Sequence, residues 1–208
     1  NQSAVKHHVY TANPSNKVAP WSSLGDPLYG SQSSEYKNVT SLSSDGTIMA
    51  VGSYYYNINS VSNVGAVFVY QYNGSSWVQL GGQIDYVNIN SETVQQSSFF
   101  GISVSLSSDG TILAVGALNF NLTESTSSSG AVFVYQYNGS SWVSLGGRID
   151  YANVNMNNTT AQTSSSFGRG ISLSSDGTIL AVGSPSFDIP GESTDNEGAV
   201  FVYQYNGS

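Results

Sequence analysis

The amino-acid sequence contains three copies of one pattern, and this internal repetition constrains the fold more than any other feature of the chain. One block reads SLSSDGTIMAVGS at residues 41–53 and recurs with few changes at 105–117 and 172–184. A second block, GAVFVYQYNGSSWV, begins at three equivalent glycines, Gly65, Gly130 and Gly198. Both blocks return after about 65 residues, which indicates that each repeat is one structural unit stacked on its neighbours.

The pattern within a repeat predicts an all-β fold of antiparallel strands. In the second repeat we expect four strands, at 101–108, 111–117, 130–137 and 142–149. The first of them alternates apolar residues with serines, as a half-buried strand does. Asp-Gly and Asn-Gly pairs lie between strands, where their glycines tolerate the positive φ of a tight hairpin turn.

The third strand of each repeat is apolar on both of its sides. In the second repeat Phe133 and Tyr135 point to one side, and Val132 and Val134 point to the other. A strand that is apolar on both sides is covered on both sides. A repeated four-stranded sheet of this kind packs against its copies as the blade of a β-propeller or the rung of a solenoid.

Short motifs lie before the first strand and at the end of the second strand of the repeats. The second repeat has FG at 100–101 before its first strand and VGA at 115–117 at the end of its second strand. The third repeat has FG at 167–168, whereas the first has YK at 36–37 in the same place. These motifs resemble the FG-GAP repeats of integrin α-subunit propellers and of many secreted and cell-surface proteins. The resemblance implies a β-propeller, which in this family usually has seven blades.

The repeats divide the chain into an N-terminal segment, residues 1–35, and three units at 36–99, 100–166 and 167–208. The third unit lacks a fourth strand, and the N-terminal segment carries an additional one at 21–30. Three residues of that additional strand, Trp21, Leu24 and Gly25, match Trp142, Leu145 and Gly146. We therefore expect three tandem propeller-type blades that are either incomplete, as in an excerpt of a longer chain, or completed by strand exchange with another copy. Such an exchange gives a ring or a filament.

Charge and composition exclude several classes of function. The chain has 5 Lys and Arg against 13 Asp and Glu, a formal net charge of -8. So few cations cannot neutralise a run of phosphates, and we expect no nucleic-acid partner. No apolar run approaches the roughly 20 residues that a membrane-spanning helix needs. With no cysteine, the chain has no disulfide framework and no thiolate chemistry.

We expect no catalytic residue, no metal and no cofactor. Integrin-type blades often carry aspartate-rich calcium loops, and calcium takes about six to eight oxygen ligands. The equivalent turns here hold one carboxylate each, at Asp45, Asp109 and Asp176, which favours a structural turn over a calcium site. The acidic insert formed by Asp188, Glu192, Asp195 and Glu197 is interpreted as a solvated loop, and His7-His8 as part of an end segment. The serines lack a G-x-S-x-G context, and Asp85 and Asp150 are repeat-equivalent, which favours a structural role.

N-glycosylation sequons are abundant and predict covalent N-glycans on an extracellular, secreted or cell-surface protein. They occur at Asn38, Asn73, Asn121, Asn138, Asn157, Asn158 and Asn206. Three of them are copies of one exposed turn. A surface with few charges gains hydration from attached glycans.

The sequence favours a non-enzymatic structural or adhesive module that self-associates through its ends. The alternative is a lectin-like or protein-binding propeller that uses the variable loops between the second and third strands and between repeats. Five loop aromatics are candidates for binding a carbohydrate or protein ligand, or for packing beneath the loops: Tyr54, Tyr55, Tyr56, Phe120 and Phe187.

Overall fold

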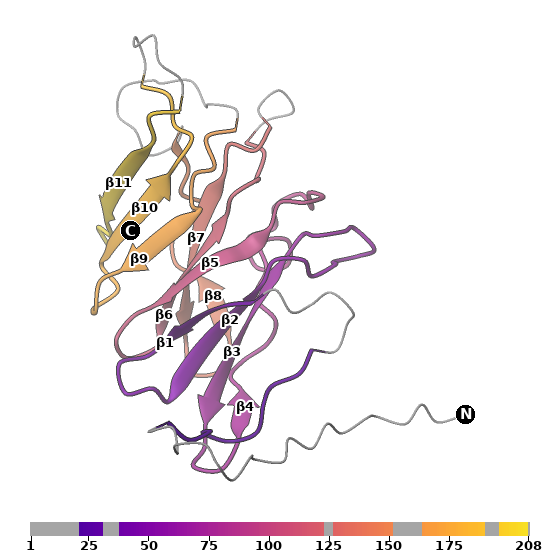
Figure 1. The fold of residues 1–208 in the computed structure, drawn as a ribbon, viewed down its shortest axis with the longest axis vertical. Coiled ribbons are helices and arrows are strands. Elements are labelled where there is room, and N and C mark those ends of the chain that lie inside the picture. Colours follow the sequence, from indigo (N-terminus) through magenta and orange to yellow (C-terminus); the bar gives the residue numbers. More distant parts are fainter. Residues whose placement is uncertain (1–20, 31–37, 123–126, 152–163, 190–195, 208) are drawn as a thin grey trace, which may run out of the picture.

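The computed structural model of the chain describes residues 21–30, 38–122, 127–151, 164–189 and 196–207. In these ranges the chain forms eleven β-strands, arranged in three antiparallel sheets that follow one another along the sequence (Figure 1). The first sheet contains β1 (Asn38–Leu42), β2 (Ile48–Ser53), β3 (Ala66–Tyr72) and β4 (Trp77–Gln79). The second contains β5 (Phe100–Leu106), β6 (Ile112–Ala117), β7 (Ala131–Tyr137) and β8 (Trp142–Ser144). The third contains β9 (Gly170–Leu173), β10 (Ile179–Ser184) and β11 (Ala199–Gln204).

The all-β prediction is confirmed, and each repeat forms its own sheet from consecutive hairpins. The first two sheets have the strand orders β1-β2-β3-β4 and β5-β6-β7-β8, and the described part of the third has β11-β10-β9. The fourth strand is shorter than predicted, because β8 ends at Ser144 rather than at Ile149. Gly146 has a φ of 78°, a left-handed conformation that interrupts the extended chain. Beyond this break, Ile149 forms an isolated antiparallel bridge with Val132.

The turn before the second strand is closed by a side chain rather than by the backbone alone. In the second repeat, Asp109 Oδ1 accepts hydrogen bonds from Ser107 Oγ at 2.6 Å and from the Thr111 backbone N–H at 3.0 Å. The same arrangement occurs at Asp45 and Asp176. These hydrogen bonds favour the ionised carboxylate, and the pKa of all three groups is lower than usual; for Asp176 it is about 2.

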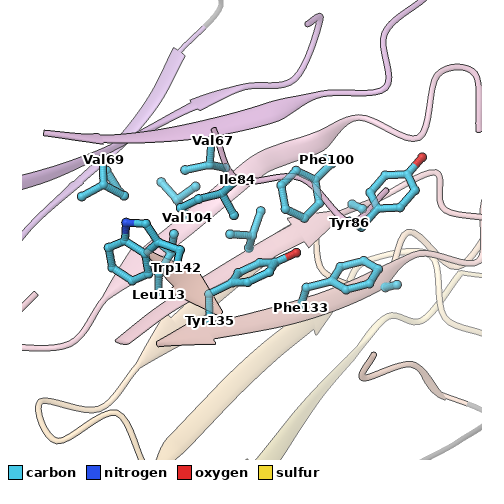
Figure 2. Packing of buried hydrophobic residues seen from close by; sticks show 14 of the residues in the cluster. Val67, Val69, Ile84, Tyr86, Phe100, Val104, Leu113, Phe133, Tyr135 and Trp142 are labelled. Carbon is cyan, nitrogen blue, oxygen red and sulfur yellow. The ribbon is translucent and has the colours of Figure 1, made fainter. Parts of the chain in front are cut away.

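The second sheet lies between the other two and is covered on both faces, as the pattern in its third strand predicts. Phe133 and Tyr135 lie on the side of the first sheet and share one hydrophobic cluster with Val67 and Val69 (Figure 2). Val132 and Val134 belong to a second cluster, shared with Phe167, Leu180 and Val182 of the third repeat. Burial of both faces of one sheet is the main stabilising contribution of the stacked repeats.

Hydrogen bonds between successive first strands connect the sheets. The Leu106 backbone N–H donates to Ser41 Oγ at 3.0 Å, and one repeat later the Leu173 N–H donates to Ser105 Oγ at 3.0 Å. A close backbone contact lies beside them, because a Cβ added to Gly52 would strike the carbonyl of Gly101 in the next repeat. The serines and glycines of the repeat therefore fix the spacing between neighbouring sheets.

Candidate functional site

A groove runs along the edge of β11, between the second and third sheets. Its volume is about 580 Å³. One side is formed by the end of the second repeat, with Leu145 and Gly146, and the other by Tyr203 and Tyr205 of the third repeat. Leu180 of the core also lies in the lining, although only 6% of its surface is exposed. The groove is the candidate functional site.

In the second repeat the equivalent space is filled by Trp142. This residue opens β8, is 4% exposed, and packs against Tyr137 with ring centroids 5.4 Å apart. Its indole N–H donates a 3.0 Å hydrogen bond to the carbonyl oxygen of Leu80 in the preceding repeat. The next residue, Gly81, approaches the ring so closely that an added Cβ would lie 2.9 Å from Trp142 Cδ1.

The same contact occurs once more at the other end of the molecule. Trp77 donates from Nε1 to the carbonyl oxygen of Leu24 at 2.9 Å and packs against Tyr72 at 5.4 Å. Leu24 and Gly25 thus lie against the first sheet as Leu80 and Gly81 lie against the second. The N-terminal segment is therefore placed like the end of a fourth strand that belongs to a preceding repeat.

Of the predicted donor residues, Trp21 and Leu24 are exposed, and Gly25 is half-buried against Trp77. Residues 21–30 form no strand, and Trp21 has 88% of its surface exposed. Such exposure is unusual for tryptophan, which is highly buried on average. At the other end, the carbonyl of Leu145 has no indole donor within the described part of the chain. Within the described residues, Trp21 therefore lacks the indole contact that Trp77 and Trp142 make, and Leu145 O lacks the indole donor that Leu24 O and Leu80 O have.

The outer face of the third sheet is also uncovered. Val200 and Val202 of β11 are 73% and 67% exposed, whereas their equivalents in the first sheet, Val67 and Val69, are fully buried. Gly183 meets only its own sheet, with Gly170 O at 3.5 Å from an added Cβ. The residues that line the groove were not predicted from the sequence, because they come from two different repeats.

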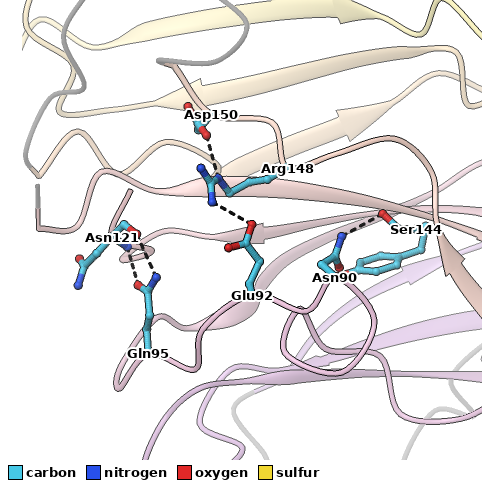
Figure 3. Close-up of polar contacts among 8 residues, drawn as sticks. Asn90, Glu92, Gln95, Asn121, Ser144, Arg148 and Asp150 are labelled. Carbon is cyan, nitrogen blue, oxygen red and sulfur yellow. Dashed lines mark hydrogen bonds and ion pairs between the residues drawn. The ribbon is translucent and has the colours of Figure 1, made fainter. Parts of the chain in front are cut away.

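A polar network joins the loops at the opposite ends of the strands (Figure 3). Arg148 binds Asp150 at 2.8 Å and Glu92 at 2.9 Å, and its guanidinium lies 5.2 Å from the centre of the Phe120 ring. Asp150 is almost fully buried and pairs with Arg148 within the segment after β8, whereas the pair of Arg148 with Glu92 connects this segment to the loop after β4. These contacts hold the loops of the first and second repeats together.

The loop aromatics are placed in two different ways. Phe120 and Phe187 are buried in the two hydrophobic clusters, so for them the packing interpretation holds. Tyr54, Tyr55 and Tyr56 are half-buried. Tyr56 packs on Phe68 at 5.5 Å, and Tyr55 packs on Phe99 at 5.5 Å.

The sequons fall mainly on exposed turns. Asn73 and Asn138 each cap their own turn, with Oδ1 accepting from two backbone N–H groups at 3.0 Å. Asn121 and Asn206 are exposed, and Asn38 begins β1. Asn157 and Asn158 lie outside the described residues. The repeated Asn-Gly-Ser turn is therefore explained by its hydrogen bonds, whether or not it is glycosylated.

Candidate metal ligands do not converge in the described residues, where no three His, Cys, Asp or Glu side chains are grouped to hold an ion. Of the acidic insert, Asp188 accepts from the Asn196 N–H and Glu197 from the Ile189 N–H, while Glu192 and Asp195 lie outside the described ranges. His7 and His8 lie outside them too. None of the described segments is a helix long and apolar enough to cross a membrane.

The sequence was also compared with known proteins. No family model matches the chain, and no curated protein matches it.

Proposed function

We propose that the chain is a non-enzymatic, extracellular structural or adhesive glycoprotein module of β-propeller type that self-associates by strand addition. In this proposal Trp21, Leu24 and Gly25 of one copy complete the third sheet of another. The observation that carries it is the groove at Leu145, which has the composition of the Trp142 site but holds no tryptophan. The likeness to FG-GAP repeats supports the propeller type of stacking.

The register of the proposed strand follows from the completed second sheet. There Tyr137 pairs with Trp142 and Gln136 pairs with Val143. By repeat equivalence, Tyr205 pairs with Trp21 of the second copy, and Gln204 pairs with its Ser22. Main-chain hydrogen bonds to the open edge of β11 supply affinity, and the tryptophan in the groove supplies specificity.

A disulfide test of this register is clean because the chain has no cysteine of its own. Protein with Ser22→Cys is mixed with protein carrying Gln204→Cys and oxidised. Directly opposed residues of antiparallel strands have Cα atoms about 4.5–5.5 Å apart, within the range that a disulfide spans. We expect a cross-linked heterodimer on a non-reducing gel.

The matched control is Gln71→Cys, mixed with the same Ser22→Cys protein. Gln71 is the equivalent of Gln204 in the first sheet, where Val78 of β4 already occupies the edge. We expect little cross-linking there, and Trp21→Ala should abolish the cross-link at Gln204. Equal cross-linking at both positions, or none at either, would overturn the proposal.

Ligand binding through the loops is a second candidate function, favoured by an aromatic group that the repeat does not require. Tyr54 and Tyr55 pack together at 4.7 Å beside Phe99, which adopts a φ of 54°. The equivalent residues at the next interface are Leu118, Asn119 and Ser166, so the stacking of sheets does not depend on these rings. Binding of a carbohydrate or protein that is lost in a Tyr54→Ala, Tyr55→Ala variant with unchanged unfolding would support this function.

A further inference from the structure

The outer faces of the first and third sheets carry the same two kinds of residues that meet at the interfaces between neighbouring sheets. Between the first and second sheets, Val67 and Val69 share one hydrophobic cluster with Phe133 and Tyr135 (Figure 2). The equivalent positions share a cluster between the second and third sheets, where Val132 and Val134 are joined by Phe201 and Tyr203. Among the described residues, no further sheet packs on the valine face of the third sheet or on the aromatic face of the first.

The valine face carries the larger exposure. Val200 and Val202 present contiguous apolar surface beside Gly183, whose added Cβ would meet no other sheet. On the first sheet, the aromatic face is formed by Phe68 and Tyr70, which are half-buried. Because valine faces receive aromatic faces at both internal interfaces, the two outer faces are complementary to one another and not to themselves. Contacts of this kind are head-to-tail.

The strand and the face are linked by the position of the N-terminal segment. Leu24 lies against Trp77 of the first sheet, as Leu80 lies against Trp142 of the second. A copy that adds Trp21 to the edge of β11 therefore brings its own first sheet over the neighbouring face, as β4 and the second sheet do within one chain. A single docked copy therefore covers both the open edge of β11 and the valine face of the third sheet.

We infer that the second copy docks its first sheet on the valine face of the third sheet while it adds its strand, and that two copies close a six-bladed ring. This inference rests on the proposed strand addition. Closed propellers have about four to eight blades. Two copies of this three-repeat chain supply six sheets, a number within this range.

The hydrogen bonds that join successive first strands have equivalents on the outer faces of the first and third sheets that are unused among the described residues. Ser41 and Ser105 each accept a hydrogen bond from a leucine N–H of the next repeat. Their equivalent in the third repeat, Ser172, is exposed. The matching leucine on the first sheet is Leu42, which is 55% exposed, whereas Leu106 is buried. In the ring, the Leu42 N–H donates to Ser172 Oγ of the second copy.

The number of copies is tested with one protein that carries both Ser22→Cys and Gln204→Cys. A closed ring of two copies has two identical interfaces, so oxidation yields a dimer and no larger species on a non-reducing gel. Light scattering of the unmodified protein should give twice the chain mass of 21.9 kDa. A ladder of multimers would overturn the ring but leave strand addition intact, whereas a monomer without cross-links would overturn both.

The substitution Gly183→Ala tests whether the second copy docks on the valine face of the third sheet. The substitution fits the isolated sheet, because the added Cβ has only an ordinary contact with Gly170 O. At the equivalent Gly52 and Gly116 the same Cβ would strike the backbone of the next sheet. We expect the dimer of the variant to dissociate at least about tenfold more readily, with unchanged unfolding of the monomer.

Two control variants distinguish docking on the valine face from strand addition at the edge of β11. Gly82→Ala, at an exposed glycine with no neighbour within 4 Å, should leave the dimer unchanged. Val200→Lys should weaken the dimer, whereas Val78→Lys, on the exposed edge strand β4, should not. Both Gly183→Ala and Val200→Lys can retain the full yield of the cross-link between Ser22→Cys and Gln204→Cys only if the second copy adds its strand without docking on the valine face. In that case this inference is wrong, while the proposed strand addition stands.

Discussion

The indole N–H of Trp142 donates a 3.0 Å hydrogen bond to the carbonyl oxygen of Leu80, which lies in the preceding repeat. The same bond joins Trp77 to Leu24 at 2.9 Å. In both cases the tryptophan opens the fourth strand of its own sheet, so the outermost strand is held by a neighbour and not only by its own hairpin. An edge strand as short as three residues gains its order from this contact between repeats.

Replacement of Trp142 tests how much of the stability depends on this contact. Trp142→Ala removes a buried ring and should lower the free energy of unfolding by about 3–5 kcal/mol. Trp77→Ala should cost less, because Trp77 is only half-buried. Urea unfolding followed by circular dichroism measures both. Equal losses would show that burial of the ring contributes little, and Val78→Ala, at an exposed position of β4, serves as the control.

Much of the fold could be predicted from the sequence, because strand alternation and repeat period are local signals. Phe133 and Val132, on opposite sides of one strand, correctly indicated a sheet covered on both faces. The length of the fourth strand was not predictable in the same way. Leu145 and Ile149 continue the apolar pattern, and only the backbone shows that Gly146 adopts a left-handed conformation and ends the strand early.

Of the two parts of the candidate site, only the N-terminal segment could be predicted from the sequence. The match of Trp21 and Leu24 to Trp142 and Leu145 depends on sequence alone, and from it the segment is predicted to act as a donor strand. The receiving groove could not be identified, because it combines residues of two repeats that are distant in the chain, such as Leu145 and Tyr205. Contacts across repeats carry no local pattern, and they emerge only when the sheets are stacked.

The glycine of the second strand should differ in importance between repeats. In Gly52→Ala the new Cβ would strike the Gly101 carbonyl, so the sheets must separate, at a cost of about 1–3 kcal/mol in unfolding free energy. Gly183→Ala should be close to neutral in the monomer, since that face is open. Denaturant unfolding below the dimer dissociation concentration gives both values. A large loss for Gly183→Ala would mean that the third sheet is tighter than the structure shows.

Acid should destabilise the turns that Asp45, Asp109 and Asp176 close. The Ser174 hydroxyl, followed by the Thr178 backbone N–H, lowers the pKa of Asp176 from 3.8 to about 2. Because the folded pKa is depressed, the contribution is fully present above the unfolded value and is lost as the pH falls through the folded one. The free energy of unfolding should therefore fall between about pH 4 and 2. Asp176→Asn should reduce this slope, and an unchanged slope would contradict the assignment.

Glycosylation and turn closure at Asn73 can be separated by one substitution. Asn73→Asp keeps an oxygen that accepts from the Ser75 and Ser76 N–H groups but removes the amide nitrogen that carries a glycan. On secretion from a eukaryotic host, the variant should lose the mass of one glycan by intact mass spectrometry while its unfolding stays nearly unchanged. Asn73→Ala should lose both the glycan and about 1 kcal/mol of stability. An unmodified parent protein from that host would contradict the glycoprotein proposal.

Lys37→Gly should strengthen the association of two copies. The equivalent residues of the other repeats are Gly101 and Gly168, at which an added Cβ would lie 2.9 Å from Ala66 O and 2.8 Å from Ala131 O. They also have φ values of 88° and 86°, a conformation that favours glycine. Lys37 has the same position in the sequence repeat and lies outside the described residues.

Lys37→Gly introduces the residue that both internal interfaces have at this position, so the dissociation constant of the proposed dimer should fall by about tenfold. Light scattering over a dilution series measures the change. Lys37→Ala is the matched control, because it removes the charge but keeps the Cβ, and it should leave the affinity near that of the parent. If alanine and glycine tighten the dimer equally, the lysine charge and not the Cβ opposes docking. If neither substitution has an effect, the first strand of the second copy does not lie on the valine face of the third sheet.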